Sequence, residues 1–179
     1  MAAGSSKRFG SNKLLQRTKG SSLIECAFAA VPSEKLKKVC VVTQYPEVEE
    51  LAASYGFSSL RNPCPEEGIS LTIRLGISEL SKDCSALMFL VSDQPLLKRS
   101  SIEGLIDFYL SHPDNIIGAA VKGKRGNPCI FPKKHFPALC SLKGDTGGSA
   151  VIRSNPDELL LFEVSKNELQ DVDTREDLK

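Results

Sequence analysis

The sequence predicts an α/β fold in which strands and helices alternate along a single domain. Continuous apolar runs of strand length occur at 39–43, 86–91 and 116–121, and such runs are typical of strands covered on both faces. Helix-like segments lie between these runs, which indicates right-handed βαβ units. At 179 residues the chain has the length of one domain. We therefore expect a Rossmann-like, three-layer sandwich with a mostly parallel sheet.

Local signals mark the ends of the predicted helices. Ser22 and Ser100 are each followed three residues later by a glutamate, which is the pattern of a capping box. The His112–Pro113 pair ends the last of these helices, because proline cannot continue a helix. The predicted helices span 22–31, 46–55, 70–80 and 101–110.

Composition argues against several classes of function. The chain has 23 basic and 22 acidic residues and a net charge of +1, so it lacks the charge footprint of a nucleic-acid or membrane-surface partner. Six dispersed cysteines and two histidines, without a Cys-x-x-Cys pair, argue against a zinc site. No apolar run approaches the ~20 residues of a membrane helix. We expect a cytoplasmic protein with reduced thiols.

The opening segment has the composition of a phosphate-binding loop. Its glycines allow tight turns and close approach of the backbone, its serines and backbone N–H groups can donate to oxygens, and its cations add charge. A frayed polar terminus has the same composition, so the residues alone leave both interpretations open. The residues concerned are Ala2, Ala3, Gly4, Ser5, Ser6, Arg8 and Lys13.

Two aspartates follow patterns that fit either a metal site or a turn. Asp93 comes directly after an apolar run, at the sheet edge where ligands bind in such folds, and a carboxylate there suits Mg²⁺. Asp93-Gln94-Pro95 is also an acceptable turn. Asp173 begins a segment that reads equally well as the N-cap of a terminal helix.

Two glycine-containing segments, 126–128 and 144–149, fit contact with an anion. The second leads into an apolar stretch and reads as a helix start with free N–H groups. The first is equally well explained as a plain loop, because glycine, asparagine and proline all favour turns.

Five segments, taken in order, resemble the molybdenum cofactor cytidylyltransferases, close relatives of the guanylyltransferases. The resemblance implies a nucleotide-diphospho-sugar transferase type of fold and transfer of CMP, or another NMP, from an NTP to a phosphorylated acceptor, molybdopterin, with release of pyrophosphate. The choice of CTP rests on Ala3, where the guanylyl branch tends towards glycine. The segments are 2–15, 62–71, 92–95, 126–128 with 144–147, and 171–178.

The resemblance also implies roles for individual residues. It implies that Arg8, Lys13 and Asp93 are catalytic residues. It also implies Mg²⁺ as the cofactor, with Asp93 and Asp173 as its ligands. Nucleotide contacts fall to Ala2, Ala3, Gly4, Ser5, Ser6, Lys13, Asn62, Gly68 and Ser70. Acceptor contacts fall to Asn127, Pro128, Gly144 and Asp145. The implied partners are CTP or another NTP, a molybdopterin-like acceptor, and a molybdenum hydroxylase or its chaperone.

Two departures concern the acceptor. Ser149 stands where the resembled family usually has arginine, and Asn127 where it often has histidine. Two alternatives therefore stay open. One is a cytidylyl- or uridylyltransferase acting on a sugar or polyol phosphate, and the other is a non-catalytic chaperone for the molybdenum cofactor.

The resembled family places an apolar strand directly before the segment that starts at Ala2. Met1 occupies the position of the last residue of that strand. We therefore expect residues 1–179 to form one nucleotidyltransferase domain that lacks its first strand. We also expect the gene to encode roughly five to eight mainly apolar residues upstream of Met1.

Overall fold

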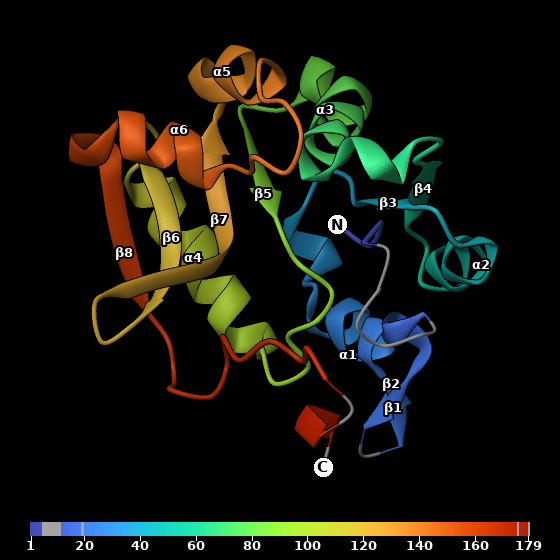
Figure 1. Cartoon of the computed structure of the whole chain (residues 1–179). Helices are drawn as coiled ribbons and strands as arrows, with labels where there is room; N and C mark the ends of the chain where they lie inside the picture. The colour runs from blue at the N-terminus through green and yellow to red at the C-terminus, as the bar shows by residue number, and fades with distance from the viewer. Residues whose placement is uncertain (5–11, 19, 175, 179) are drawn as a thin grey trace.

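A four-stranded sheet forms the centre of the larger part of the molecule (Figure 1). In this computed structural model, which describes residues 1–4, 12–18, 20–174 and 176–178, the strand order is β5-β7-β6-β8. Strand β7 is antiparallel to both β5 and β6, and β8 is parallel to β6. The bounds are β5 (Ala86–Phe89), β6 (Ile116–Val121), β7 (Lys124–Pro132) and β8 (Leu159–Glu163).

Helices cover both faces of this sheet, which confirms the predicted α/β sandwich. In β6, Ile116 belongs to the core cluster that contains residues of α3, α5 and α6. The next residue, Ile117, belongs to the cluster with Leu105 and Tyr109 of α4, because successive side chains of a strand point to opposite faces. The bounds are α3 (Ile69–Leu80), α4 (Arg99–Ser111), α5 (Phe136–Cys140) and α6 (Ser149–Ser154).

The N-terminal half adds a parallel pair of strands, two helices and a small hairpin (Figure 1). The capping box that starts α1 is confirmed: Glu25 N donates to Ser22 Oγ at 3.3 Å, and Ser22 N donates to Glu25 Oε2 at 2.7 Å. The bounds are β1 (Arg17–Thr18), β2 (Ser21–Ser22), α1 (Leu23–Ala30), β3 (Cys40–Thr43), α2 (Pro46–Ser54) and β4 (Ser58–Arg61). Short 3-10 helices span Lys13–Leu15, Ser33–Lys35, Pro65–Glu67, Ser81–Asp83, Lys133–His135, Pro156–Glu158 and Glu176–Leu178.

The capping box predicted at Ser100 is wrong. Helix α4 begins two residues earlier, at Arg99, with Lys98 as its N-cap and no side-chain cap from its own segment. Instead, the backbone N–H of Lys98 donates to Glu168 Oε2 at 3.1 Å, and Glu103 pairs with Arg99. A carboxylate from a distant segment thus satisfies the free N–H group that a local cap would have satisfied.

The mostly parallel sheet that the sequence predicts holds for β3–β4 and β6–β8 but not for β7. Residues 126–128, which read as a turn, lie inside this antiparallel strand. The hairpin turn lies earlier in the chain, between β6 and β7, at Lys122 and Gly123. Both residues have positive φ (52° and 74°), as a two-residue type I′ turn requires. The register between β6 and β7 shifts between Gly118 and Ala120.

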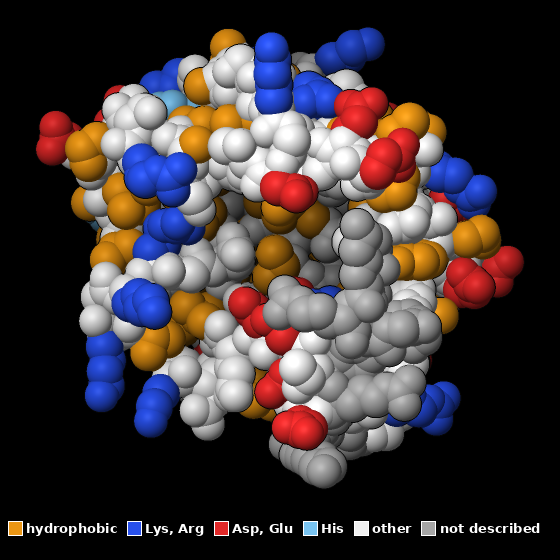
Figure 2. Space-filling view, in the orientation of Figure 1, with side chains coloured by type: hydrophobic (Ala, Val, Ile, Leu, Met, Phe, Trp, Pro, Cys, Tyr) orange, Lys and Arg blue, Asp and Glu red, His pale blue; other side chains and the backbone are white. Residues whose placement is uncertain are grey.

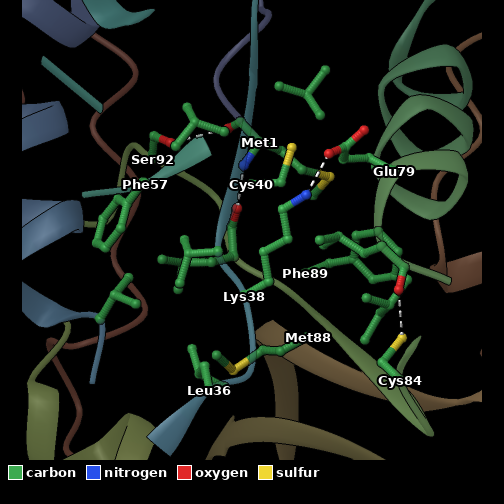
Figure 3. Close-up of a pocket in the computed structure, with 18 of the residues that line it drawn as sticks. Met1, Leu36, Lys38, Cys40, Phe57, Glu79, Cys84, Met88, Phe89 and Ser92 are labelled. Carbon is green, nitrogen blue, oxygen red and sulfur yellow. Dashed lines mark hydrogen bonds and ion pairs between the residues drawn. The ribbon is translucent and has the colours of Figure 1, made fainter. Parts of the chain in front are cut away.

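A gap separates β3 from β5. Among the described residues, β3 pairs along its length only with β4, and β5 pairs only with β7. Residues 1 and 2 enter one end of this β3–β5 gap: Ala2 N donates to Val42 O at 2.9 Å, and Met1 N to Leu90 O at 2.7 Å. The rest of the gap is a cavity of about 320 Å³ (Figure 3). Apolar side chains dominate its lining, among them Phe28, Val39, Phe57, Leu80, Leu87 and Phe89.

The α-amino group of Met1 gives folding a pH dependence. Burial lowers its pKa from 8.0 to about 6, although the Asp93 carboxylate opposes the shift. Between about pH 6 and 8 the unfolded chain therefore binds more protons than the folded chain, and the free energy of unfolding is expected to rise with pH. The rise is on the order of 2 kcal/mol. Urea denaturation across this pH range measures it.

The control is the same chain with a five-residue Gly-Ser extension, which moves the amine away from Leu90. Its unfolding free energy should rise less steeply over the same pH range. Equal slopes for the two chains would contradict the assignment to Met1.

No disulfide links the six cysteines, all of which lie in the described segments. Within the described parts of the chain, the helices are too short or too polar to cross a membrane.

Candidate nucleotide site

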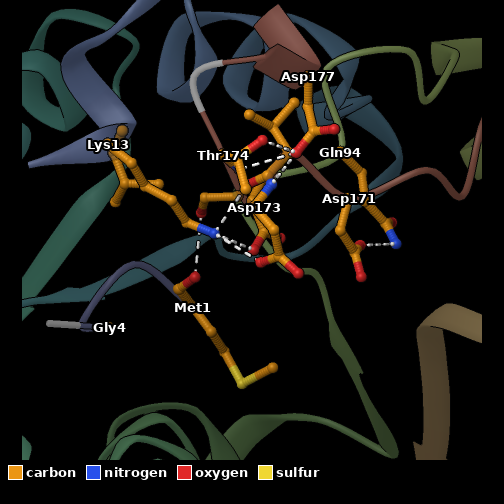
Figure 4. Close-up of polar contacts among 12 residues, drawn as sticks. Met1, Gly4, Lys13, Gln94, Asp171, Asp173, Thr174 and Asp177 are labelled. Atoms are coloured by element: carbon orange, nitrogen blue, oxygen red, sulfur yellow. Dashed lines mark hydrogen bonds and ion pairs between the residues drawn. The ribbon is translucent and has the colours of Figure 1, made fainter. Parts of the chain in front are cut away.

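Lys13 lies at the centre of a charged cluster formed by three segments that are far apart in sequence (Figure 4). Its Nζ donates to Asp93 Oδ2 at 2.8 Å and to the carbonyl oxygen of Val172 at 3.0 Å. Asp173 Oδ1 lies 3.8 Å from the same nitrogen. The side chains of Lys13 and Asp93 are only 17% and 25% exposed, so this ion pair is partly shielded from water.

The cluster carries more negative than positive charge. Gln94 Nε2 donates to Asp171 Oδ1 at 2.8 Å. Burial raises the pKa of Asp171, and the neighbouring carboxylates Asp93 and Asp173 raise it further. Three carboxylates therefore lie near one ammonium group, and such an arrangement attracts cations.

The donors in this cluster fit a hard divalent cation. Asp93 and Asp173 both present an oxygen to the Lys13 ammonium, so the two carboxylates already face a common positive charge. Mg²⁺ is commonly held by one or two carboxylates, with substrate phosphates and water as its other ligands. Within the described ranges, no group of three or more His, Cys, Asp or Glu residues could hold a metal by itself. The site fits a metal that arrives with its phosphate ligand.

The turn after Asp173 is closed by a different residue. Asp177 Oδ2 accepts hydrogen bonds from the backbone N–H groups of Asp173 at 3.0 Å and Thr174 at 2.7 Å. The Asp173 carboxylate faces Lys13 (Figure 4). The sequence left two roles open for Asp173, a metal ligand and a helix N-cap; in the structure its carboxylate joins the cluster through its contact with Lys13.

The start of the opening loop is fixed by three consecutive side chains, that of the last residue of β3 and those of the two residues after it. The carbonyl oxygens of residues 2–4 accept hydrogen bonds, in order, from Thr43 Oγ1 at 3.0 Å, Gln44 Nε2 at 2.8 Å and Tyr45 Oη at 3.0 Å. Ala2 and Ala3 are buried, which leaves space only for small side chains there. The sequence analysis missed this triplet. The pattern that could have revealed it is a run of three polar side chains that begins at the end of an apolar strand. Ser5, Ser6 and Arg8 lie outside the described residues.

Two segments with different expected roles touch one another. Gly68, with φ of +84°, lies so close to the loop at 144 that an added Cβ would come within 2.5 Å of the Gly144 carbonyl carbon. It would also lie 2.6 Å from Asp145 Oδ1. The backbone N–H of Ser70 donates to Gly144 O at 3.1 Å. The structure thus joins the expected nucleotide segment to the expected acceptor segment.

The side chains of Asn62 and Ser70 are buried and have partners inside the protein. Asn62 Nδ2 donates to Thr72 Oγ1 at 3.2 Å, and Asn62 Oδ1 accepts from the Cys64 backbone at 3.0 Å. Ser70 Oγ accepts from Arg74 at 3.2 Å. These bonds connect the end of β4 to α3 and hold the segment beside the loop.

A smaller cavity of about 100 Å³ lies between β5, β7 and the start of α6. We call it the β7–α6 pocket, defined by its polar residues Arg125, Asn127 and Ser149. Asn127 is the expected acceptor residue that lines it, whereas Gly144 and Asp145 pack on Gly68. Sequence reasoning missed Arg125, although a cation directly before the Gly126-Asn127-Pro128 motif was a usable signal.

The face that carries these features is hollowed at its centre (Figure 2). Apolar side chains lie in the hollow, and acidic side chains line its lower rim. The hollow thus combines an apolar interior with a charged edge.

Comparisons with known proteins agree with this geometry. Residues 1–159 match the family model of the MobA-like NTP transferase domain. The purine catabolism protein PucB of Bacillus subtilis (strain 168) is 26% identical over 189 residues, which cover 99% of this chain and 91% of PucB. Since the family model matches most of the chain, the family is shown by sequence.

Solved structures show the same fold. A nucleotidyl transferase from Methanothermobacter thermautotroptrophicus (Mth528) superimposes with a TM-score of 0.81, at 20% identity, and covers 98% of this chain and 90% of that one. Molybdopterin-guanine dinucleotide biosynthesis protein A from Archaeoglobus fulgidus gives a TM-score of 0.68, at 14% identity, and covers 99% and 92% of the two chains. With the family match and the architecture in agreement, the chain belongs to the MobA-like NTP transferase domain family.

Proposed function

We propose that the protein transfers CMP from CTP to a phosphate oxygen of a molybdopterin-like acceptor and releases pyrophosphate. The observation that carries this proposal is the position of Lys13, between Asp93 and Asp173. A lysine and two carboxylates, positioned together, are what phosphoryl-transfer chemistry uses to hold a triphosphate with its cation.

Each residue has a defined task in this proposal. An oxygen of the acceptor phosphate attacks the α-phosphorus of CTP, and the bond from that phosphorus to the bridging oxygen of the pyrophosphate breaks. Lys13 and Arg8 neutralise the charge that develops on the α-phosphate, and residues 2–6 position the triphosphate. Asp93 and Asp173 would hold Mg²⁺, which would supply further positive charge to the phosphate oxygens.

The partners follow from the acceptor. We propose that a molybdenum hydroxylase, or the chaperone that serves it, receives the product. Six cysteines without a disulfide among them fit a reducing compartment, and we place the reaction in the cytoplasm.

Nucleotide binding gives the first test. With Mg²⁺ present, CTP should raise the melting temperature more than GTP, ATP or UTP. A ligand at a hundredfold excess over its dissociation constant stabilises by about 2.7 kcal/mol, or roughly 5–10 °C for a chain of this size. Differential scanning calorimetry measures the shift, and stronger stabilisation by GTP would overturn the choice of CTP.

Turnover gives the second part of this test. Pyrophosphate release should depend on molybdopterin and should not occur with sugar or polyol phosphates. Release with the latter would favour the alternative transferase. Stabilisation by CTP without release in the presence of molybdopterin would favour a chaperone.

A further inference from the structure

The packing of Arg125 on its neighbouring strand determines the direction of its side chain. Arg125 in β7 pairs with Ala120 in β6, and its aliphatic stem lies over Gly118. A Cβ at Gly118 would come within 2.9 Å of Arg125 Cγ. A glycine therefore makes room for the arginine stem. The guanidinium at its end reaches Ser149, the first residue of α6.

The guanidinium is partly buried, and the groups that it contacts among the described residues are neutral. Its nitrogens donate to Ser149 Oγ at 2.8 Å and to the carbonyl oxygen of Gly126 at 3.3 Å, and contact Cys129 Sγ at 3.4 Å. No carboxylate of the described residues lies within 4.0 Å of it. By contrast, Arg61 and Arg74 each pair with a glutamate.

An arginine held in this way retains both charge and donor capacity. A guanidinium has five N–H donors in a planar fork that matches the oxygens of a phosphate or carboxylate. Because neutral partners orient the fork without cancelling its charge, the arrangement is suited to an anion from outside the chain.

The β7–α6 pocket supplies the second part of the argument. Apolar walls formed by Ile73, Phe89, Phe131 and Ile152 face the polar group of Arg125, Asn127 and Ser149. Val91, which also lines the pocket, lies two positions before Asp93 in the chain, so one segment contributes to both the pocket wall and the Lys13 cluster. A ligand that fits has an apolar body with an oxyanion attached.

We propose that Arg125 binds an oxyanion of the acceptor, and that the apolar walls of the β7–α6 pocket hold the body of that acceptor. The identification of the ligand as the acceptor rests on the proposed function. The anion site itself rests only on the geometry of Arg125 and the pocket. Arg125 is in this sense a specificity-determining residue, distinct from the residues that bind the triphosphate.

Phenyl phosphate is the probe, because it joins a flat apolar ring to a phosphate, and phenol is its uncharged counterpart. Isothermal titration calorimetry should show saturable binding of phenyl phosphate in the millimolar range and much weaker binding of phenol. Arg125→Gln keeps the stem over Gly118 and removes the charge. It should weaken phenyl phosphate binding about tenfold or more.

Two further variants separate this site from other cations. Lys124→Gln removes the same charge from the exposed neighbour of Arg125 and should leave the affinity unchanged. Lys13→Met disturbs the other proposed phosphate site and should also leave it unchanged. Arg125→Lys should recover only part of the affinity, because an ammonium lacks the planar fork.

The outcomes distinguish this inference from the proposed function. Equal affinity of wild type and Arg125→Gln, or no saturable binding by wild type, overturns the anion site. Arg125-dependent binding in a protein that binds no nucleotide supports the anion site and overturns nucleotidyl transfer. In an active enzyme, Arg125→Gln should raise KM for the acceptor and leave KM for CTP unchanged.

Discussion

Replacing Lys13 with alanine should lower kcat/KM for CTP-dependent pyrophosphate release by about 10²- to 10³-fold, because the variant loses the positioned charge that acts on the transition state in the proposed reaction. The fold should survive, since the Lys13–Asp93 pair is partly solvated and its loss costs no more than about 1–2 kcal/mol. Lys13→Arg should also be poor, because a planar guanidinium does not replace a compact ammonium between two carboxylates. Steady-state kinetics and thermal melting, measured on the same samples, separate the two effects.

Lys35→Ala is the matched control. Lys35 makes an ion pair with Asp107 at 2.8 Å on the exposed surface, so this variant loses a lysine and an ion pair elsewhere. It should keep wild-type turnover. Asp93→Asn, which changes charge but hardly volume, should shift the magnesium dependence to much higher concentrations. Near wild-type turnover in Lys13→Ala, or an unchanged magnesium titration in Asp93→Asn, would remove the residue from the proposed mechanism.

Adding one apolar strand before Met1 should produce the largest gain in stability. Residues 1 and 2 already bond to Leu90 and Val42, one on each side of the β3–β5 gap. An apolar extension of about five residues would continue in the same direction and meet the unpaired edges of both strands. Burial of its side chains should raise the free energy of unfolding by on the order of 5 kcal/mol, after the cost of ordering the segment. The melting temperature should rise by about 10–20 °C.

The comparison needs two extensions of equal length. One consists of valine, isoleucine and leucine, and the other has the same residues with a central proline, which removes a backbone donor and disfavours pairing. Only the first should stabilise and reduce aggregation. We also propose that the strand supports the loop that follows it, so CTP affinity should rise with the first extension alone. Equal melting temperatures for the two chains would show that the gap does not accept a strand.

The sequence predicted those parts of the fold that depend on local patterns. Helix α1 begins at Leu23 with Ser22 as its N-cap, as the capping box predicts, and β6 has the predicted bounds because its apolar run is uninterrupted. Strand β7 escaped prediction, since Gly126 and Pro128 look like turn residues and only the neighbouring strand shows that they lie in a sheet. The cap of α4 was not predicted either, because the carboxylate that accepts from the Lys98 N–H belongs to Glu168, in a distant segment.

The two residues at the centre of the candidate site were singled out from the sequence by the segments that precede them. A lysine after a glycine-rich loop and an aspartate after a buried strand led to the pair that the structure joins, Lys13 and Asp93. Their bond to one another, and the convergence of Asp173 on the same ammonium, depend on how three segments pack. Arg125 was missed although it directly precedes the Gly126-Asn127-Pro128 motif, because in sequence it is one of many cations. Only the structure shows that its stem packs on Gly118 and that its guanidinium bonds to Ser149.

The bond from Lys13 to Val172 spans 159 residues, which has a consequence for synthesis of the protein on the ribosome. Val172 N also donates to the backbone carbonyl oxygen of Asp93 at 2.9 Å, so the same late segment bonds to both Lys13 and Asp93. Contacts between such distant positions form late, because the intervening chain must be synthesised and ordered first. A nascent chain can thus fold its α1–β3–α2 region early, yet it assembles the Lys13 cluster only after Val172 has left the exit tunnel.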